Sequence, residues 1–239
     1  MMSSANLSLD EQARKLMKES ATVALIGFAY FVIAVVALYF LNPAYDLISS
    51  FKGNYDLGSY EFLIASTFFG LGLGSLALVI GLYQGVSQSM GSWFGLLLLG
   101  IWSVGIFIAG IFPANEGGST VPHITTVLIA GIFPVDVEAV PETAFSFIHT
   151  LAILGSFFSL TLSTILLSWR FKQDEKWRPF HGLGLILALT LIVSSISSIL
   201  LFQTELIDFS LGLLTISSLM WLLLTAARLR FVANKISSK

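Results

Sequence analysis

The sequence predicts an all-α integral membrane protein, a bundle of six transmembrane helices with an acidic extracytoplasmic cap between helices three and four. Three observations lead to this prediction. The 239-residue chain is 56% hydrophobic and only 11% charged, whereas a soluble domain carries about a quarter charged residues. Its apolar residues gather into six long stretches, and its charges separate onto opposite sides of those stretches. The bilayer is therefore the main solvent of this chain.

A transmembrane helix needs about 20 mostly apolar residues. Six stretches within a membrane domain at 21–230 meet this requirement, at roughly 21–41, 61–83, 92–112, 144–169, 180–203 and 207–229. The fifth and sixth stretches are separated by a very short turn around 204–206. We therefore expect these two helices to be antiparallel neighbours.

The first 20 residues are predicted to form a cytoplasmic amphipathic arm. Ser8 and Glu11 have the spacing of a capping box, and apolar residues recur at helical spacing up to Glu19. We expect a short helix here that lies in the membrane interface, with its basic residues toward the anionic surface. The alternative is a solvated arm. Residues 231–239 are predicted to form a cytoplasmic tail.

The charges predict the direction in which the chain crosses the membrane. Eleven of the twelve Lys and Arg residues lie on one side of the six spans, and nine of the fourteen Asp and Glu residues lie on the other. Cytoplasmic loops carry an excess of Lys and Arg, so the basic side is predicted to be cytoplasmic. This makes the chain a multi-pass protein of the cell (cytoplasmic) membrane, with both termini in the cytoplasm.

Composition excludes several classes of protein. The absence of cysteine excludes disulfides, iron–sulfur clusters and thiolate zinc sites. A net charge of −2 and a pI near 5.9 argue against nucleic acid as a partner. Transport is poorly supported, because no Asp, Glu, Lys or Arg lies at the middle of a span. No cofactor is predicted, and the expected partners are membrane lipids and either another integral membrane protein or a second copy of the chain.

Glycines recur within the spans at a spacing of four residues. Gly70 with Gly74, and Gly91 with Gly95, have the pattern that lets the backbones of two helices approach closely. We expect these glycines to pack helices within the bundle. The alternative is an interface between two copies of the chain.

The connection between the third and fourth spans, 113–143, is predicted to form the outer cap loop. Its apolar run at 124–134 is too short to cross a bilayer and is predicted to be an interfacial or re-entrant element. A Gly-Ile-Phe-Pro sequence occurs twice, at 110–113 and 131–134. Proline lacks an N–H and disfavours helix in the preceding residue, so each copy is predicted to end a helix at the outer boundary.

The pattern Gly-x-Phe-Pro-x-Asp at 131–136 is followed by His149 near the start of the next span and by a basic connection with Trp177-Arg178. This arrangement resembles the DUF998 family over about 21–230. Members of that family are multi-pass membrane proteins of prokaryotes without an assigned activity. The resemblance implies the fold and the topology and adds no reaction. The doubled Gly-Ile-Phe-Pro departs from the single copy in the family.

His149 is the strongest candidate for a functional residue, because an ionisable residue inside a span usually faces the bundle interior and marks a site. An imidazole near carboxylates suits general acid–base catalysis, so His149, Asp136 and Glu138 are the candidate catalytic residues. The alternative is a histidine at the headgroup level, hydrogen-bonded to a neighbouring carboxylate. No metal site is predicted, since no histidine pair has the spacing of a helix-borne zinc site. The polar outer-face site predicted from the sequence is Glu116, His123, Asp136, Glu138, Glu142 and His149.

Three functions remain open at this point. The favoured one is a non-enzymatic subunit that packs against another membrane protein or binds lipid through its apolar surface, with the acidic outer face as a docking or ion-binding surface. The second is an outer-facing, membrane-embedded hydrolase or lipid-modifying enzyme that uses His149 with Asp136 or Glu138. The third, a cofactor-holding subunit of an electron-transfer complex, rests only on the two outer histidines.

Overall fold

The computed structural model describes residues 4–41, 61–87, 89–112, 142–200 and 206–235. Six helices of this part are long and apolar enough to cross a membrane, which confirms the predicted all-α fold with six transmembrane helices. Their ends lie within three residues of the predicted spans, except at the start of the first helix and the end of the last. The helices are α1 (Ser4–Leu41), α3 (Glu61–Gly85), α4 (Met90–Ile111), α6 (Glu142–Phe171), α7 (Arg178–Leu200) and α8 (Ile207–Lys235).

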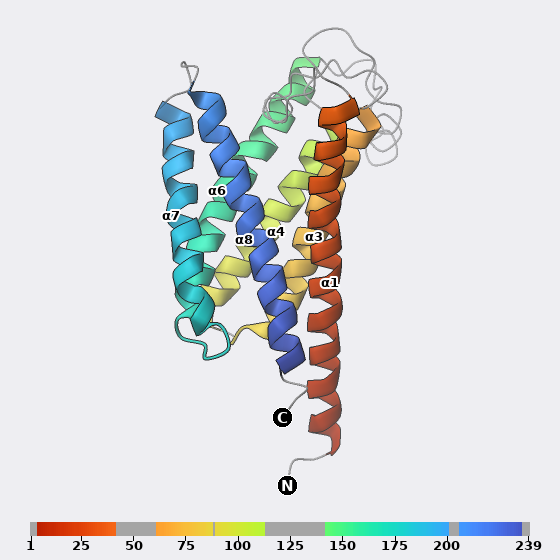
Figure 1. Cartoon of the computed structure of the whole chain (residues 1–239), viewed down its shortest axis with the longest axis vertical. Coiled ribbons are helices and arrows are strands. Elements are labelled where there is room, and N and C mark those ends of the chain that lie inside the picture. The colour runs from red at the N-terminus through yellow and green to blue at the C-terminus, as the bar shows by residue number, and fades with distance from the viewer. Residues whose placement is uncertain (1–3, 42–60, 88, 113–141, 201–205, 236–239) are drawn as a thin grey trace.

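The helices form an up-and-down bundle in which each helix packs on the next one in the chain (Figure 1). The last helix, α8, returns to α1 and closes the ring, and it also touches α3. The start of α1, the end of α8 and the connection between α6 and α7 all lie at one end of the bundle (Figure 1). We call this the basic end, because the Lys and Arg residues of the described part all belong to these segments.

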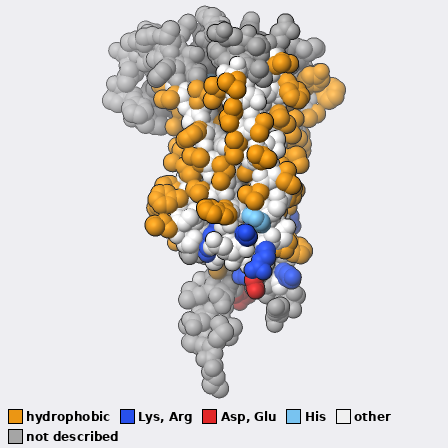
Figure 2. Space-filling model, turned by 90° about the vertical axis from the view of Figure 1, so that its left-hand side faces the viewer, with side chains coloured by type: hydrophobic (Ala, Val, Ile, Leu, Met, Phe, Trp, Pro, Cys, Tyr) orange, Lys and Arg blue, Asp and Glu red, His pale blue; other side chains and the backbone are white. Residues whose placement is uncertain are grey.

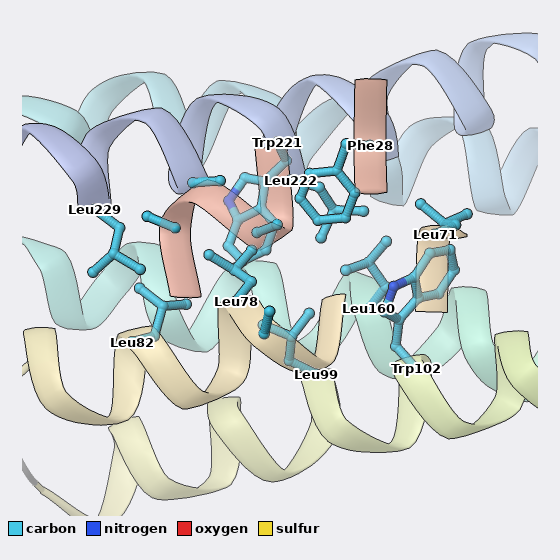
Figure 3. Close-up of a cluster of buried hydrophobic side chains, with 14 of the residues drawn as sticks. Phe28, Leu71, Leu78, Leu82, Leu99, Trp102, Leu160, Trp221, Leu222 and Leu229 are labelled. Atoms are coloured by element: carbon cyan, nitrogen blue, oxygen red, sulfur yellow. The ribbon is translucent and has the colours of Figure 1, made fainter. Parts of the chain in front are cut away.

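Large side chains fill the interior of the ring. Phe28 from α1, Leu160 from α6 and Trp221 from α8 are each fully buried and lie together between the helices (Figure 3). Trp102 from α4 is buried beside them, and its indole N–H donates to Ser75 Oγ on α3 at 2.9 Å. A buried indole without an acceptor would cost about 1–3 kcal/mol, so this bond fixes the register between α3 and α4.

The outer surface of the bundle is apolar along its length. On the face shown in Figure 2, apolar side chains cover the middle of the molecule, and Lys and Arg gather below them. The exposed side chains include Ile33 on α1, Leu154 on α6 and Ile199 on α7. A soluble monomer rarely exposes a contiguous apolar surface of this extent, and lipid tails solvate it at no cost.

The N-terminal arm is not a separate interfacial helix. α1 begins at Ser4 and runs without a break into the first span, so Ser8 is not the cap of a helix. No Gly or Pro interrupts residues 4–26, and the chain has no local reason to leave the helix. Met17, near the end of the arm, is 3% exposed and packs into the bundle. Part of the predicted tail at 231–239 is likewise helical, because α8 continues to Lys235.

Several predicted features lie outside the described residues. They are the acidic cap and its apolar run at 124–134, the second Gly-Ile-Phe-Pro copy at 131–134 and most of the turn between α7 and α8, at 201–205. The described part of the 113–143 connection begins with α6 at Glu142. The conformation of the cap therefore stays a prediction.

Three of the four glycines predicted to pack helices lie where two helices approach closely. A Cβ added to Gly70 would lie 2.6 Å from a side chain of α1, and one added to Gly74 would lie 2.9 Å from another. A Cβ on Gly95 would lie 2.8 Å from a side chain of α6. Gly91 differs, because a Cβ there would meet open space. Gly91 therefore packs against no helix of the described chain.

The closest approach in the bundle is between α1 and α3. A Cβ on Gly27 would lie 2.5 Å from the carbonyl oxygen of Gly70 and 3.0 Å from Cα of Gly74. The two backbones are therefore in direct contact, as small residues spaced by four allow between membrane helices. Gly27 contributes to this contact as much as the α3 glycines do.

We expect Gly27→Ala to destabilise the protein by about 1–3 kcal/mol, because the added methyl group overpacks a backbone contact. Gly182→Ala is the matched control, since a Cβ at that α7 position meets open space. Alanine is a better helix former than glycine, so the control should be neutral or stabilised by up to about 1 kcal/mol. The measurement is the free energy of unfolding in a denaturing-detergent titration. Equal stability of the two variants would contradict the backbone contact.

Candidate functional site

The first Gly-Ile-Phe-Pro motif ends α4. Phe112 is the C-cap of this helix, with φ −109° and ψ 83°, and its N–H donates to Ile108 O at 2.9 Å. In an α-helix the carbonyl of Ala109 would accept the N–H of residue 113. That residue is Pro113, which has no N–H. The carbonyl of Ala109 therefore needs a donor from elsewhere, because an unsatisfied backbone group in a membrane costs several kcal/mol.

His149 on α6 supplies this donor. Its side chain is completely buried, and its Nδ1 lies 3.0 Å from Ala109 O and 2.9 Å from Phe112 O. A carbonyl oxygen can only accept a hydrogen bond, so Nδ1 carries the proton and donates to both oxygens. The side chain of α6 thus closes the end of α4.

Helix α3 meets the other two helices at the same point. A Cβ on Gly110 would lie 2.9 Å from Cβ of Phe68, so only glycine lets α3 come this close. The ring of Phe68 meets the imidazole of His149 edge to face, with 6.2 Å between centroids and 79° between planes. Three helices therefore meet at this motif. Its glycine lets α3 pack closely against α4. Its proline leaves the carbonyl of Ala109 without a backbone donor, and His149 of α6 supplies one.

The structure describes only one side chain of the predicted polar outer-face site, that of His149. The other members lie outside the described side chains: Glu116, His123, Asp136, Glu138 and the side chain of Glu142. Among the described residues, no group of three His, Asp or Glu side chains is placed to hold a metal ion. Cooperation between His149 and Asp136 or Glu138 stays a prediction. The contacts of Nδ1 give His149 a part in closing a helix.

A second feature lies on the outer surface of the bundle, where α4 passes between α3 and α6. It is an almost wholly apolar groove of about 650 Å³. Trp93 lines it toward the basic end and Ile108 toward the opposite end. These residues are fifteen positions apart on one helix, so the groove follows α4 for about 22 Å.

The floor and wall of this groove contain small residues. A Cβ on Gly100 or on Gly155 would meet no atom within 4 Å, so both positions are open. Ser156, beside Gly155, also lines the groove; it is 1% exposed, and its Oγ has no hydrogen-bond partner among the described residues. Three other hydroxyls of α6, those of Ser159, Thr161 and Thr164, donate to the carbonyl four residues back, whereas Ser168 Oγ resembles Ser156 Oγ in having no partner among the described residues.

The fold defines the class of protein: a multi-pass membrane protein whose six helices form one bundle. A family model described as a protein of unknown function, DUF998, matches residues 25–228. The chain belongs to this family, which confirms the resemblance found in its motifs. No curated protein and no solved structure matches the chain.

Sequence reasoning selected His149 but looked for its partners on the loop that precedes it. The structure places the partners of Nδ1 on the backbone of the preceding span, at Ala109 and Phe112. A signal for this was present, because Pro113 removes a donor at the level where the next helix carries a buried histidine. Ser156 carried no comparable signal, since serines occur throughout the last three spans.

We expect His149→Leu to lower the free energy of unfolding by about 1–3 kcal/mol, because it leaves the buried carbonyl of Ala109 and the half-buried carbonyl of Phe112 without this donor. Leucine fills a similar volume, so the loss reports the hydrogen bonds. His149→Asn keeps an N–H near the position of Nδ1 and should be less destabilised than His149→Leu. Unfolding of both variants in the same detergent measures the difference. A Leu variant as stable as the native protein would contradict the closure of α4 by His149.

Proposed function

We propose that the protein is a non-enzymatic membrane subunit whose α4 groove receives a transmembrane helix of another membrane protein. The observation that supports the proposal is the groove beside the buried Ser156 hydroxyl. The side chains at its rim, such as Leu97 and Val104, are about half exposed on the bundle surface. The groove is thus accessible from the membrane.

The length of the groove favours a helix over a single acyl chain. One leaflet supplies about half of the roughly 30 Å hydrocarbon core, or about 15 Å. The groove follows α4 for about 22 Å, so it extends beyond the reach of one leaflet. A transmembrane helix spans that whole depth.

The small residues of the groove favour the same occupant. Ser156 Oγ lies directly against Gly105, so α4 and α6 meet closely at the base of the groove. Membrane helices associate through small residues of this kind, whereas acyl chains have no need of them. The open positions at Gly100 and Gly155 add the small residues that close helix approach requires.

Symmetry favours a different protein over a second copy of this chain. Two identical subunits usually pair the same surface patch around a two-fold axis. Two facing grooves would leave a void between them, and membrane helices associate largely through close packing. A convex helix from another protein fills the groove without that loss.

The non-enzymatic part of the proposal is supported by the surroundings of His149. Its Nδ1–H is engaged by two backbone carbonyls, and its side chain is 0% exposed. A general acid–base residue must reach the proton that it transfers. Docking at the acidic outer face, which includes Glu116 and Asp136, is a further part of the proposal that rests on the sequence alone.

A photoreactive benzoylphenylalanine at Ile101, inside the groove, is expected to form one discrete adduct with another membrane protein in native membranes. The control position is Leu189 on α7, which is 61% exposed and lies outside the groove. Filling the groove with Gly155→Phe should abolish the adduct at Ile101. Gly182→Phe, at an equally open position on α7, should leave it unchanged.

The adduct is measured by mass on a denaturing gel and by mass spectrometry. An adduct with twice the mass of the chain would identify a second copy as the occupant and overturn the proposal. Lipid adducts alone, or equal protein adducts at Ile101 and Leu189, would overturn it as well.

The direction of insertion is also proposed from charge. The ten Lys and Arg residues of the described part belong to the segments at the basic end. The positive-inside rule then supports a basic end in the cytoplasm of a cell (cytoplasmic) membrane protein. In that orientation α1 begins and α8 ends on the cytoplasmic side.

The absence of native cysteine allows a direct test of this orientation. Asp208→Cys lies at the start of α8, and Lys172→Cys lies in the connection at the basic end. We expect a membrane-impermeant maleimide to label the first variant in intact cells and the second only after permeabilisation. Labelling of Lys172→Cys in intact cells would show the opposite orientation.

A further inference from the structure

The connection between α6 and α7 is held rigidly at the basic end. Trp177 is fully buried, and its indole N–H donates to Gly85 O, at the end of α3, at 2.9 Å. Its ring stacks on Phe171 with 4.5 Å between centroids and 14° between planes. Lys176 and Arg178 flank this anchor, and both are exposed. The buried Trp177 therefore fixes the backbone on which Lys176 and Arg178 are carried.

A third cation joins them from α8. The guanidinium of Arg228 donates through Nη2 to the carbonyl of Lys176. It also lies over the ring of Phe231, 5.1 Å from the centroid. Residues far apart in the sequence are thus brought together at one place, and we call Lys176, Arg178 and Arg228 the basic cluster.

Two carboxylates, Asp174 and Glu175, precede the cluster in the same connection, but neither forms a salt bridge with it among the described residues. Asp174 instead accepts backbone N–H groups through both oxygens, from Lys176 at 2.9 Å and from Ser87 at 3.1 Å. The two salt bridges of the described residues both lie on α1, Arg14–Glu11 and Lys15–Glu19. Arg178 is also the first residue of α7, where the helix dipole adds positive potential.

We propose that the basic cluster binds the phosphate headgroup of an anionic phospholipid. The cluster lies at the end of α7 and α8 where the exposed apolar surface of these helices stops, and the exposed ring of Phe231 lies beside Arg228. A lipid bound there keeps its acyl chains on that surface while its phosphate meets the three cations. A soluble anion would make no use of the apolar surface. This site is separate from the α4 groove and stands or falls independently of it.

The test uses the full chain in detergent micelles and native mass spectrometry. Phosphatidylglycerol is the anionic probe, and phosphatidylcholine is the zwitterionic control. We expect the native protein to retain phosphatidylglycerol preferentially. The double variant Lys176→Gln, Arg178→Gln should lose affinity about 25-fold, because each cation near an anionic lipid contributes about fivefold. Neither side chain makes a hydrogen bond that the structure records among the described residues, so the variant should fold.

The matched control is Arg14→Gln, Lys15→Gln, which removes two charges that are already paired on α1. It should change the affinity for phosphatidylglycerol less than about twofold. Equal retention of the two lipids, or equal loss in both double variants, would overturn the proposal. Displacement of phosphatidylglycerol by inorganic phosphate at the same concentration would also overturn it, since the site would then recognise a free anion. Thermal unfolding of each variant verifies that it is folded.

Discussion

The requirement that helix-terminal carbonyls find a donor inside a membrane organises this bundle. The end of an α-helix leaves carbonyls without partners, and lipid offers none. Here the donors are ring N–H groups of buried or half-buried side chains. They close the ends of α3, α4 and α6: Trp177 at Gly85 O, His149 at Ala109 O and Phe112 O, and His181 at Ser168 O, 2.7 Å away.

Each of these donors comes later in the chain than the carbonyl that it satisfies. A helix end is therefore completed only when a later part of the chain packs against it: α6 for the end of α4, α7 for the end of α6, and the connection between α6 and α7 for the end of α3. The same contacts have consequences for function. His149 closes α4 from within the bundle, whereas the groove follows the outer surface of the same helix. The buried indole of Trp177 fixes the backbone that carries Lys176 and Arg178.

Much of the fold could be predicted from the sequence, and the predictable part has a physical reason. Span positions follow from hydropathy alone, because a helix of about twenty apolar residues matches the thickness of the hydrocarbon core. The continuation of α1 through the N-terminal arm could not be predicted, since it depends on the burial of Met17 against other helices. The partner of His149 depends on which span ends meet in space. The groove depends on how α3, α4 and α6 cross, and no local pattern records that geometry.

The most direct test of this account is the protonation pattern of the His149 ring. Nitrogen-15 NMR of histidine-labelled protein, assigned with the His149→Asn variant, distinguishes the two ring nitrogens. Donation to Ala109 and Phe112 predicts a protonated, hydrogen-bonded Nδ1. A neutral ring protonated at Nε2 alone would contradict the account, because Nδ1 would then face two carbonyl oxygens with no proton to share.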